Sequence, residues 1–264
     1  MIQFNLKRFG KLACWTLTND KRYFIKSFLQ MFVILLLIFL FFTMLVNGNN
    51  ADPHGYKSCT ISIMAILGVD IIVGPALMFY SMEGKHDMQT LMMLPASNFE
   101  KYLVRYAHWL VLLPCYLVTI LGADLIQYLI HLVAGHDYAR FVTSVLINDV
   151  IGDTLMTSAE VSHPRFLSTL IVLVIWFQSL YALGATLFRT RKFNWVITTM
   201  AIILLGIVIY KIQGVVEAVS LDNNSTTMDY AVGYGIYLVW VILNYWLSYR
   251  CFCRTQVISK WVNL

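Results

Sequence analysis

The chain has 264 residues, of which 59% are hydrophobic and 12% charged, and its 19 Lys and Arg against 14 Asp and Glu give a formal net charge of +5. Soluble domains average about half apolar and a quarter charged residues, so this composition excludes an ordinary soluble protein and indicates a polytopic membrane protein. We expect an all-α fold forming a single transmembrane domain over residues 1–264. It would comprise a cytoplasmic interfacial arm (1–26), a six-helix bundle (27–250) and a cytoplasmic tail (251–264).

The N-terminal arm has the pattern of an amphipathic helix that lies in the membrane interface. Its apolar residues share one face and its first cations lie opposite. These are Ile2, Leu6, Phe9, Ala13 and Leu17 against Lys7, Arg8 and Lys11. The apolar face would sit at the headgroup boundary and the cations near anionic lipid. A simple anchor for the first span explains the pattern equally well. The following apolar run is about 20 residues long without a small-x-small cleavage site, which favours a retained span over a signal peptide.

Six stretches reach the length of about 20 mostly apolar residues that a membrane crossing requires. They are residues 27–46, 59–82, 102–132, 166–188, 194–212 and 230–249. The first is almost wholly apolar and is expected to face lipid. The third is long enough to tilt or to project beyond the bilayer.

The second expected span carries a carboxyl and a helix break. Asp70 lies near its middle and costs about 2.5–3.5 kcal/mol of insertion free energy. Gly74-Pro75 predicts a kink, because proline removes a helix hydrogen bond that neighbouring groups or water must replace. We therefore expect this helix to be buried among others, with Asp70 facing a partner side chain or a polar cavity.

The third expected span repeats this theme with Pro114, Asp124 and Gln127, and helical spacing places Asp124 and Gln127 on one face. Asp70 and Asp124 are the best candidates for an intramembrane polar pair, although they need not meet. Two interpretations stay open: a substrate or ion path, or hydrogen bonds between helices that fix their packing.

A polar bridge over residues 83–105 joins the second and third spans. Its first part predicts a short helix with a face of methionine and leucine, ended by Pro95. Ser97 and Glu100 then form an S-x-x-E capping box for the next helix. The bridge is either a surface on which a partner in the aqueous phase pushes, or a solvated loop with a well-capped helix after it.

The outer segment, residues 133–165, predicts a short amphipathic helix on the outer surface or capping the bundle. Its apolar positions are Tyr138, Phe141, Val142, Val145 and Leu146. Four groups near this segment could be mistaken for a metal cluster: His131, His136, Asp137 and His163. No histidine pair has H-x-x-x-H spacing, so we expect no metal site. The short turn 188–194 predicts an antiparallel hairpin of the fourth and fifth spans.

Fifteen of the nineteen Lys and Arg residues fall in the arm, the bridge, the 189–192 turn and the tail, and four fall on the opposite side. The positive-inside rule therefore predicts cytoplasmic termini and a cytoplasmic bridge. Because the cations are dispersed among loop ends, topology explains the net charge and we expect no nucleic-acid partner.

Catalytic signatures are absent from the sequence. It has no G-x-x-x-x-G-K-[ST], G-x-S-x-G or H-E-x-x-H motif, and its five cysteines contain no C-x-x-C. We expect neither an enzyme nor a cofactor. An enzyme acting on lipid through Asp70, Asp124 and His108 would be a third possibility, but no motif supports it.

The sequence LMMLPAS at 91–97, followed by EK at 100–101, stands in a bridge after the second of six spans, and the tail reads YRCFCR at 249–254. This combination resembles the permease subunits of type-2 ABC exporters, in the form found among Bacteroidetes. In that family the bridge contains a coupling helix that docks on a separate ATP-binding subunit, and two permeases form the pathway. Here the larger outer segment lies between spans three and four, whereas the family usually places its re-entrant outer helices between the last two spans.

The resemblance implies an ATPase-docking face at Met88, Leu91, Met92 and Leu94. We assign hinge and cap roles to Gly74, Pro75, Pro95, Ser97 and Glu100. The expected function is a multi-pass permease subunit of an ATP-driven exporter in the bacterial inner membrane. Its partners would be an ABC ATP-binding subunit docked on residues 83–101, a second permease copy or paralogue, and membrane lipid. The alternative is a non-transporting membrane scaffold or a signalling or assembly protein.

Overall fold

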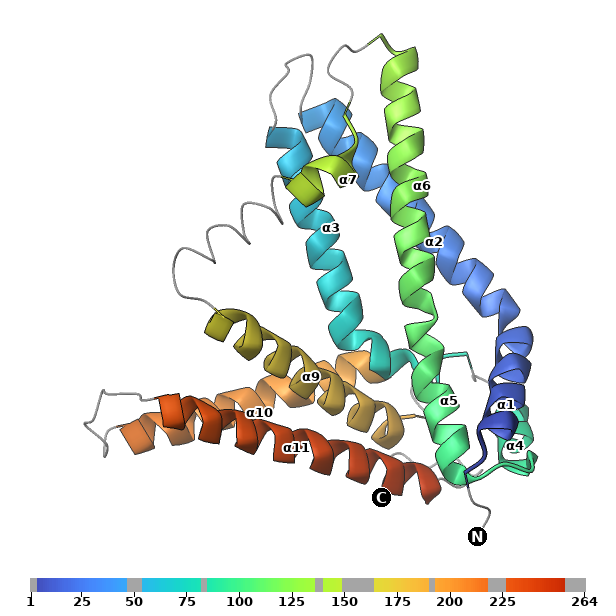
Figure 1. Ribbon diagram of the computed structural model, residues 1–264, viewed down its shortest axis with the longest axis vertical. Coiled ribbons are helices and arrows are strands. Elements are labelled where there is room, and N and C mark those ends of the chain that lie inside the picture. The colour runs from blue at the N-terminus through green and yellow to red at the C-terminus, as the bar shows by residue number, and fades with distance from the viewer. Residues whose placement is uncertain are drawn as a thin grey trace. The chain divides into compact units, whose positions relative to one another are not determined.

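The computed structural model describes residues 4–46, 54–81, 85–135, 140–148, 164–189, 193–217 and 227–254, and all regular structure in these ranges is helical (Figure 1). Five helical stretches are long and apolar enough to cross a membrane: Lys21–Met44, Gly55–Leu77, Asn98–Val133, Ser168–Leu187 and Tyr234–Cys253. They correspond to five of the six expected spans. The remaining expected span, residues 194–212, corresponds to a shorter apolar helical stretch, Asn194–Val208, among the described residues.

The chain divides into two compact units. Unit 1 comprises Met1–Trp15, Ile71–Trp109 and Ser168–Leu264, and unit 2 comprises Thr16–Asp70 and Leu110–Leu167. We describe each by itself. The prediction of a single transmembrane domain stays a prediction.

Unit 2 contains the first apolar helix, most of the second and the C-terminal part of the third expected span. Its elements are α2 (Lys21–Leu40), the π-helical Phe41–Val46, α3 (His54–Val73) as far as Asp70, α6 (Leu112–Val133) and α7 (Val142–Val145). The buried core draws on the four α-helices: Leu35, Phe39, Tyr56, Cys59, Ile63, Ile120, Ala123, Val142 and Val145. The outer segment thus contributes a short helix that caps this core.

Helices α2 and α6 run parallel, as the predicted topology requires of the first and third spans. Ser27 is hydrogen-bonded to Tyr116 near one end, with 3.1 Å between the hydroxyl oxygens. Thr43 is hydrogen-bonded to His131 near the other end, with 2.9 Å between Oγ1 and Nε2. Interhelical polar contacts of this kind hold apolar helices in register where lipid supplies no hydrophobic drive.

Unit 1 contains the bridge and the last three long helices. Its elements are α1 (Leu6–Asn19) as far as Trp15, the 3₁₀ helix Gly74–Leu77, α4 (Lys85–Met93), α5 (Asn98–Leu110), α9 (Pro164–Leu187) from Ser168, α10 (Asn194–Glu217) and α11 (Thr227–Cys253). One buried cluster gathers Met78, Phe79, Leu91, Tyr102, Ala185 and Phe252. A second gathers Leu12, Ala96 and Val104.

Helices α9 and α10 form the antiparallel hairpin that the short turn predicts. A Cβ atom at Gly184 would lie 2.2 Å from Thr198 Oγ1, so only glycine permits this approach of the two helices. Tyr181 is hydrogen-bonded to Thr199, with 2.9 Å between the oxygens.

Helix α11 runs parallel to α9 and is joined to it by polar contacts. Asn244 Nδ2 donates to Ser179 Oγ at 3.0 Å, and Ser248 Oγ donates to the Ala182 carbonyl at 3.0 Å. Tyr102 of α5 is hydrogen-bonded to the Ser248 hydroxyl at 3.0 Å, which ties the bridge end of α5 to both helices.

Candidate functional site

The bridge is a helix, a reversal and a second helix. α4 ends at Met93, just before Pro95, and α5 begins at Asn98. The S-x-x-E pattern forms its two reciprocal bonds: the Ser97 N–H donates to Glu100 Oε2 at 2.9 Å, and the Glu100 N–H donates to Ser97 Oγ at 3.2 Å. The reversal is therefore fixed locally by the sequence.

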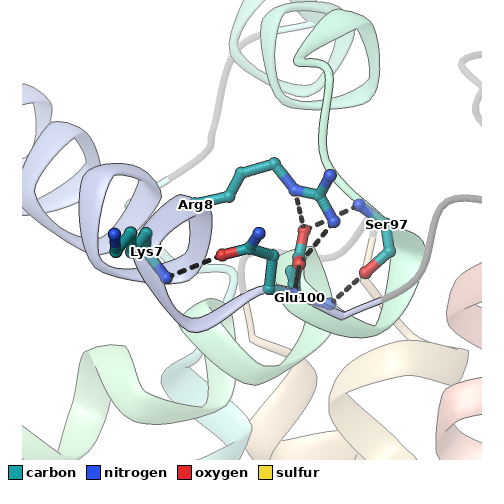
Figure 2. Close-up of polar contacts among 5 residues, drawn as sticks. Lys7, Arg8, Ser97 and Glu100 are labelled. Carbon is teal, nitrogen blue, oxygen red and sulfur yellow. Dashed lines mark hydrogen bonds and ion pairs between the residues drawn. The ribbon is translucent and has the colours of Figure 1, made fainter.

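Glu100 also binds a distant segment (Figure 2). Arg8 Nε donates to Glu100 Oε2 at 2.8 Å, and Arg8 Nη2 donates to Glu100 Oε1 at 2.7 Å. The Asn5 N–H donates to Oε1 at 2.7 Å. We call Asn5, Arg8, Ser97 and Glu100 the bridge clamp. A two-pronged Arg–carboxylate pair is among the stronger protein hydrogen-bonding arrangements and fixes orientation as well as distance.

The clamp keeps Glu100 ionised although its side chain is buried. The hydrogen bonds from Arg8, with smaller contributions from the Asn5 and Ser97 N–H groups, lower the pKa of Glu100 from 4.5 to about 2 against the opposing effect of burial. The same pair raises the pKa of Arg8. The 22 residues of α6 are by themselves long enough to cross a bilayer. Glu100 lies before α6, ahead of this membrane-crossing segment.

Helix α1 packs on the bridge with Leu12 and with only part of the predicted apolar face. Leu12 is buried against Ala96 and Val104, and Phe9 and Ala13 pack around this cluster. The other described members of the predicted apolar face, Leu6 and Leu17, are exposed. Arg8, expected among headgroups, turns to Glu100 instead. The Arg8–Glu100 bonds and the burial of Leu12 together hold α1 in this rotation about its axis.

Two further cations of α5 are turned inward. Lys101 Nζ donates to the Met92 carbonyl at 2.8 Å and so satisfies the C-terminal end of α4. Burial lowers the pKa of Lys101. Arg105 is buried, and its Nη1 donates to Ser81 Oγ at 3.0 Å. Both cations brace the bridge from within.

The expected docking face needs correction at Leu91. Its side chain is 0% exposed and belongs to the core around Phe79 and Phe252, so it is not available to a partner in this conformation. Met92 and Leu94 are partly buried, and the side chain of Met88 lies outside the described residues. Met93 is 83% exposed, and Phe99 is also exposed. Helix rotation turns Leu91 inward, and Met93, two residues on, outward.

Asp124, in the middle part of α6, caps α7. Its Oδ1 accepts the Val142 N–H at 2.8 Å, and its Oδ2 accepts the Thr143 N–H at 2.9 Å. The first N–H groups of a helix lack partners within it, and the acid supplies them. Of the two interpretations of this carboxyl, the geometry supports fixed packing.

Asp70 and Gln127 differ from Asp124. Asp70 is partly buried and makes no hydrogen bond or ion pair with any residue that the structure describes, Asp124 included. Gln127 is fully buried one turn beyond Asp124, and its amide makes no hydrogen bond within the described residues. Asp70 and Asp124 therefore do not form a polar pair.

The helix break at Gly74-Pro75 is present as a 3₁₀ turn, Gly74–Leu77, following directly on α3. A Cβ atom at Gly74 would lie 2.8 Å from the Trp109 ring, so glycine is required here by close packing. The 3₁₀ turn confirms that α3 departs from a regular helix at the position the sequence predicts.

The other candidate groups form no chemical centre in the described part of the chain. No three His, Cys, Asp or Glu side chains gather there in a metal-binding arrangement. His131 is bonded to Thr43, and His108 is buried in α5, whereas His136, Asp137 and His163 lie outside the described residues.

Sequence reasoning found Ser97 and Glu100 but missed Asn5 and Arg8. The capping box is a local pattern and can be recognised within four residues. Arg8 is 92 residues from Glu100, and within its own helix it has the appearance of any interfacial cation. The sequence gives no signal for this pairing.

No protein-family model matches this chain, and no curated protein or solved structure is significantly similar to it.

Proposed function

We propose that this chain is the membrane-spanning permease subunit of an ATP-driven exporter, and that a separate ATP-binding subunit docks on the bridge at residues 83–101. The long apolar helices make it a membrane-embedded protein. The bridge clamp is the observation that carries the proposal, because a surface that transmits force must be held rigidly to the helices behind it.

The construction of the bridge suits that role. Its reversal is held by the Glu100 bonds to Ser97, Asn5 and Arg8, and α4 is pinned to α5 through Lys101. Tyr102 continues the connection to α9 and α11 through Ser248. Pushing the bridge would thus displace α1, α5 and α11 together.

In this mechanism the partner closes on ATP, and the two states of the membrane helices differ in how well they fit the closed partner. The affinity difference supplies the conformational bias, since a ligand shifts an equilibrium only by its differential affinity. The substrate is not identified; the aromatic and Met residues would suit an amphiphilic one. A second permease copy or paralogue would complete the pathway, with both termini in the cytoplasm of a bacterial inner membrane.

Co-purification tests the docking. The probe is a phosphate-loop ATPase encoded beside this chain, co-expressed and captured through a tag on that ATPase. We expect Met93→Asp to reduce recovery of this chain at least tenfold, because a charge would be placed at the most exposed large apolar side chain among the described residues of the bridge.

The matched control is Val133→Asp at the opposite end of the third span, since Val133 is 85% exposed and Met93 is 83% exposed. The control should leave recovery unchanged. Equal recovery of the Met93→Asp variant and wild type would remove the bridge as the docking surface.

A non-transporting scaffold that binds another cytoplasmic partner through the same bridge is the second candidate. The exposed apolar side chains of Met93 and Phe99 favour some partner there without specifying an ATPase. A neighbouring gene for a phosphate-loop ATPase supports the exporter, whereas a gene for a kinase or secretion machinery supports the scaffold.

A further inference from the structure

The break in α3 leaves two backbone carbonyls without their helical donors. Pro75 has no N–H, so it cannot donate to the Ile71 carbonyl four residues earlier. The chain then tightens into the 3₁₀ turn, and the Tyr80 N–H donates to Leu77 O at 2.9 Å. An α-helix would direct that donor to Ala76, whose carbonyl therefore loses it.

Two amide side chains bind these carbonyls. Gln178 Nε2 of α9 donates to Ile71 O at 2.9 Å. Asn194 Nδ2, at the first residue of α10, donates to Ala76 O at 2.8 Å. The two donors come from the two arms of one hairpin, which the approach of Gly184 to Thr198 holds tightly together.

The break is also enclosed by α5. The Trp109 ring lies against Gly74 so closely that a methyl group would not fit between them. Asn194 is 4% exposed, so its bond to Ala76 is closed to solvent. The kinked segment therefore contacts the hairpin through two directed bonds and α5 through one packed ring.

In a membrane these bonds have no ready substitute. Lipid offers no donor to a freed carbonyl, and an unsatisfied backbone group in an apolar medium is costly. Any change in the kink that left the hairpin behind would break both amide bonds at once.

We propose that Gln178 and Asn194 are positioning residues that fix the Pro75 kink to the α9–α10 hairpin, so that the end of α3 leading into the bridge moves with the hairpin as one body. If the proposed function holds, this connection is the route by which a displacement of the bridge reaches α9 and α10. The bonds and their test do not depend on an ATPase.

A double-variant comparison tests the bonding. In the wild-type background, Gln178→Leu should lower the unfolding temperature of the purified full chain by about 2–6 °C. In a Pro75→Ala background the same substitution should cost little, because residue 75 then has an N–H for Ile71 O. An equal loss in both backgrounds would overturn the proposal.

Asn244→Leu is the matched control. It removes a similar amide contact, from α11 to Ser179 of α9, that does not involve the kink. Its effect on the unfolding temperature should be the same with and without Pro75→Ala. If Gln178→Leu alone fails to fold, recovery of folded protein on adding Pro75→Ala supports the proposal, and no recovery contradicts it.

Spin-label distances test the shared movement. Labels at Tyr80→Cys and Phe193→Cys, both exposed and both in unit 1, report the kink and the hairpin. The exposed Cys14 and Cys253 are replaced by Ser in every sample. We expect a narrow distance distribution that broadens in the Gln178→Leu/Asn194→Leu variant and stays narrow in Asn244→Leu. An unchanged distribution in the first variant would overturn the proposal, whereas failed co-purification would bear only on the ATPase.

Discussion

Glu100 has two roles that are set by different parts of the chain. Its bonds with Ser97 begin α5, and its bonds with Asn5 and Arg8 hold α1 against the bridge. A buried carboxylate requires this many donors, because a charge without partners in an apolar setting would be very costly. The residue that caps the helix is thus also the residue that fixes the N-terminal arm.

Removing the arginine of the clamp should destabilise the protein. Arg8→Ala should lower the free energy of unfolding, because it removes two hydrogen bonds to a buried carboxylate. Denaturant unfolding in detergent measures the change. Lys11→Ala, an exposed cation of the same helix, should change it by less than about 0.5 kcal/mol. Similar losses for the two variants would contradict the assignment of the clamp.

The clamp also predicts a pH dependence. Because the pKa of Glu100 is lowered from 4.5 to about 2 in the folded state, its contribution to stability is present in full above pH 4.5. That contribution is lost as the pH falls from 4.5 towards 2. Over this window the unfolding temperature of wild type should fall more steeply than that of Glu100→Gln. Parallel curves would show that Glu100 ionisation does not stabilise the fold.

At the scale of elements, α7 shows how a short helix is held by a residue outside it. Four residues are too few for a stable isolated helix, so α7 depends on tertiary contacts. Asp124 supplies two acceptors at its N-terminus, and Val142 and Val145 enter the core. In unit 1 the close approach of α9 and α10 likewise depends on a single residue, Gly184.

Asp124→Ala should release α7. We expect a loss of about 1–3 kcal/mol in the free energy of unfolding, since one buried and one partly buried N–H group lose their acceptor. Amide hydrogen exchange over residues 141–146 should become faster. Asp70→Asn is the matched control, because Asp70 has no hydrogen bond within the described residues, and it should leave this exchange unchanged. Unchanged exchange in Asp124→Ala would refute the capping role.

For the whole molecule, the bridge and the outer helix are expected on opposite sides of the membrane. α2 and α6 run parallel, and α7 packs against the C-terminal halves of both (Figure 1). The cation distribution predicts a cytoplasmic bridge. The proposed function requires this orientation, because a cytosolic ATPase must reach the bridge.

Cysteine labelling measures the orientation. With Cys14 and Cys253 replaced by Ser, a membrane-impermeant maleimide should label Phe141→Cys in intact cells. It should label Asn98→Cys only after permeabilisation. Both positions are exposed, so access and not burial decides the result. Labelling of Asn98→Cys from outside would remove the proposed function.

The sequence by itself determined the helical membrane class, the ends of the bridge helices, the capping box and the break at Pro75. Each depends on groups within a few residues of one another: apolar run length, a missing N–H, or a side chain that reaches its own backbone. The positions of Asp124 and Gln127 on one helix face follow from helical spacing in the same way.

Only the tertiary structure decided which partners the polar groups have. It paired Glu100 with Arg8, Asp124 with the N–H groups of α7, and the carbonyls at the Pro75 break with Gln178 and Asn194. It also turned Leu91 into the core and left Met93 exposed. These outcomes depend on which helix faces meet across many tens of residues, and an apolar helix with a nearly uniform surface carries little information about the neighbour that it will pack against.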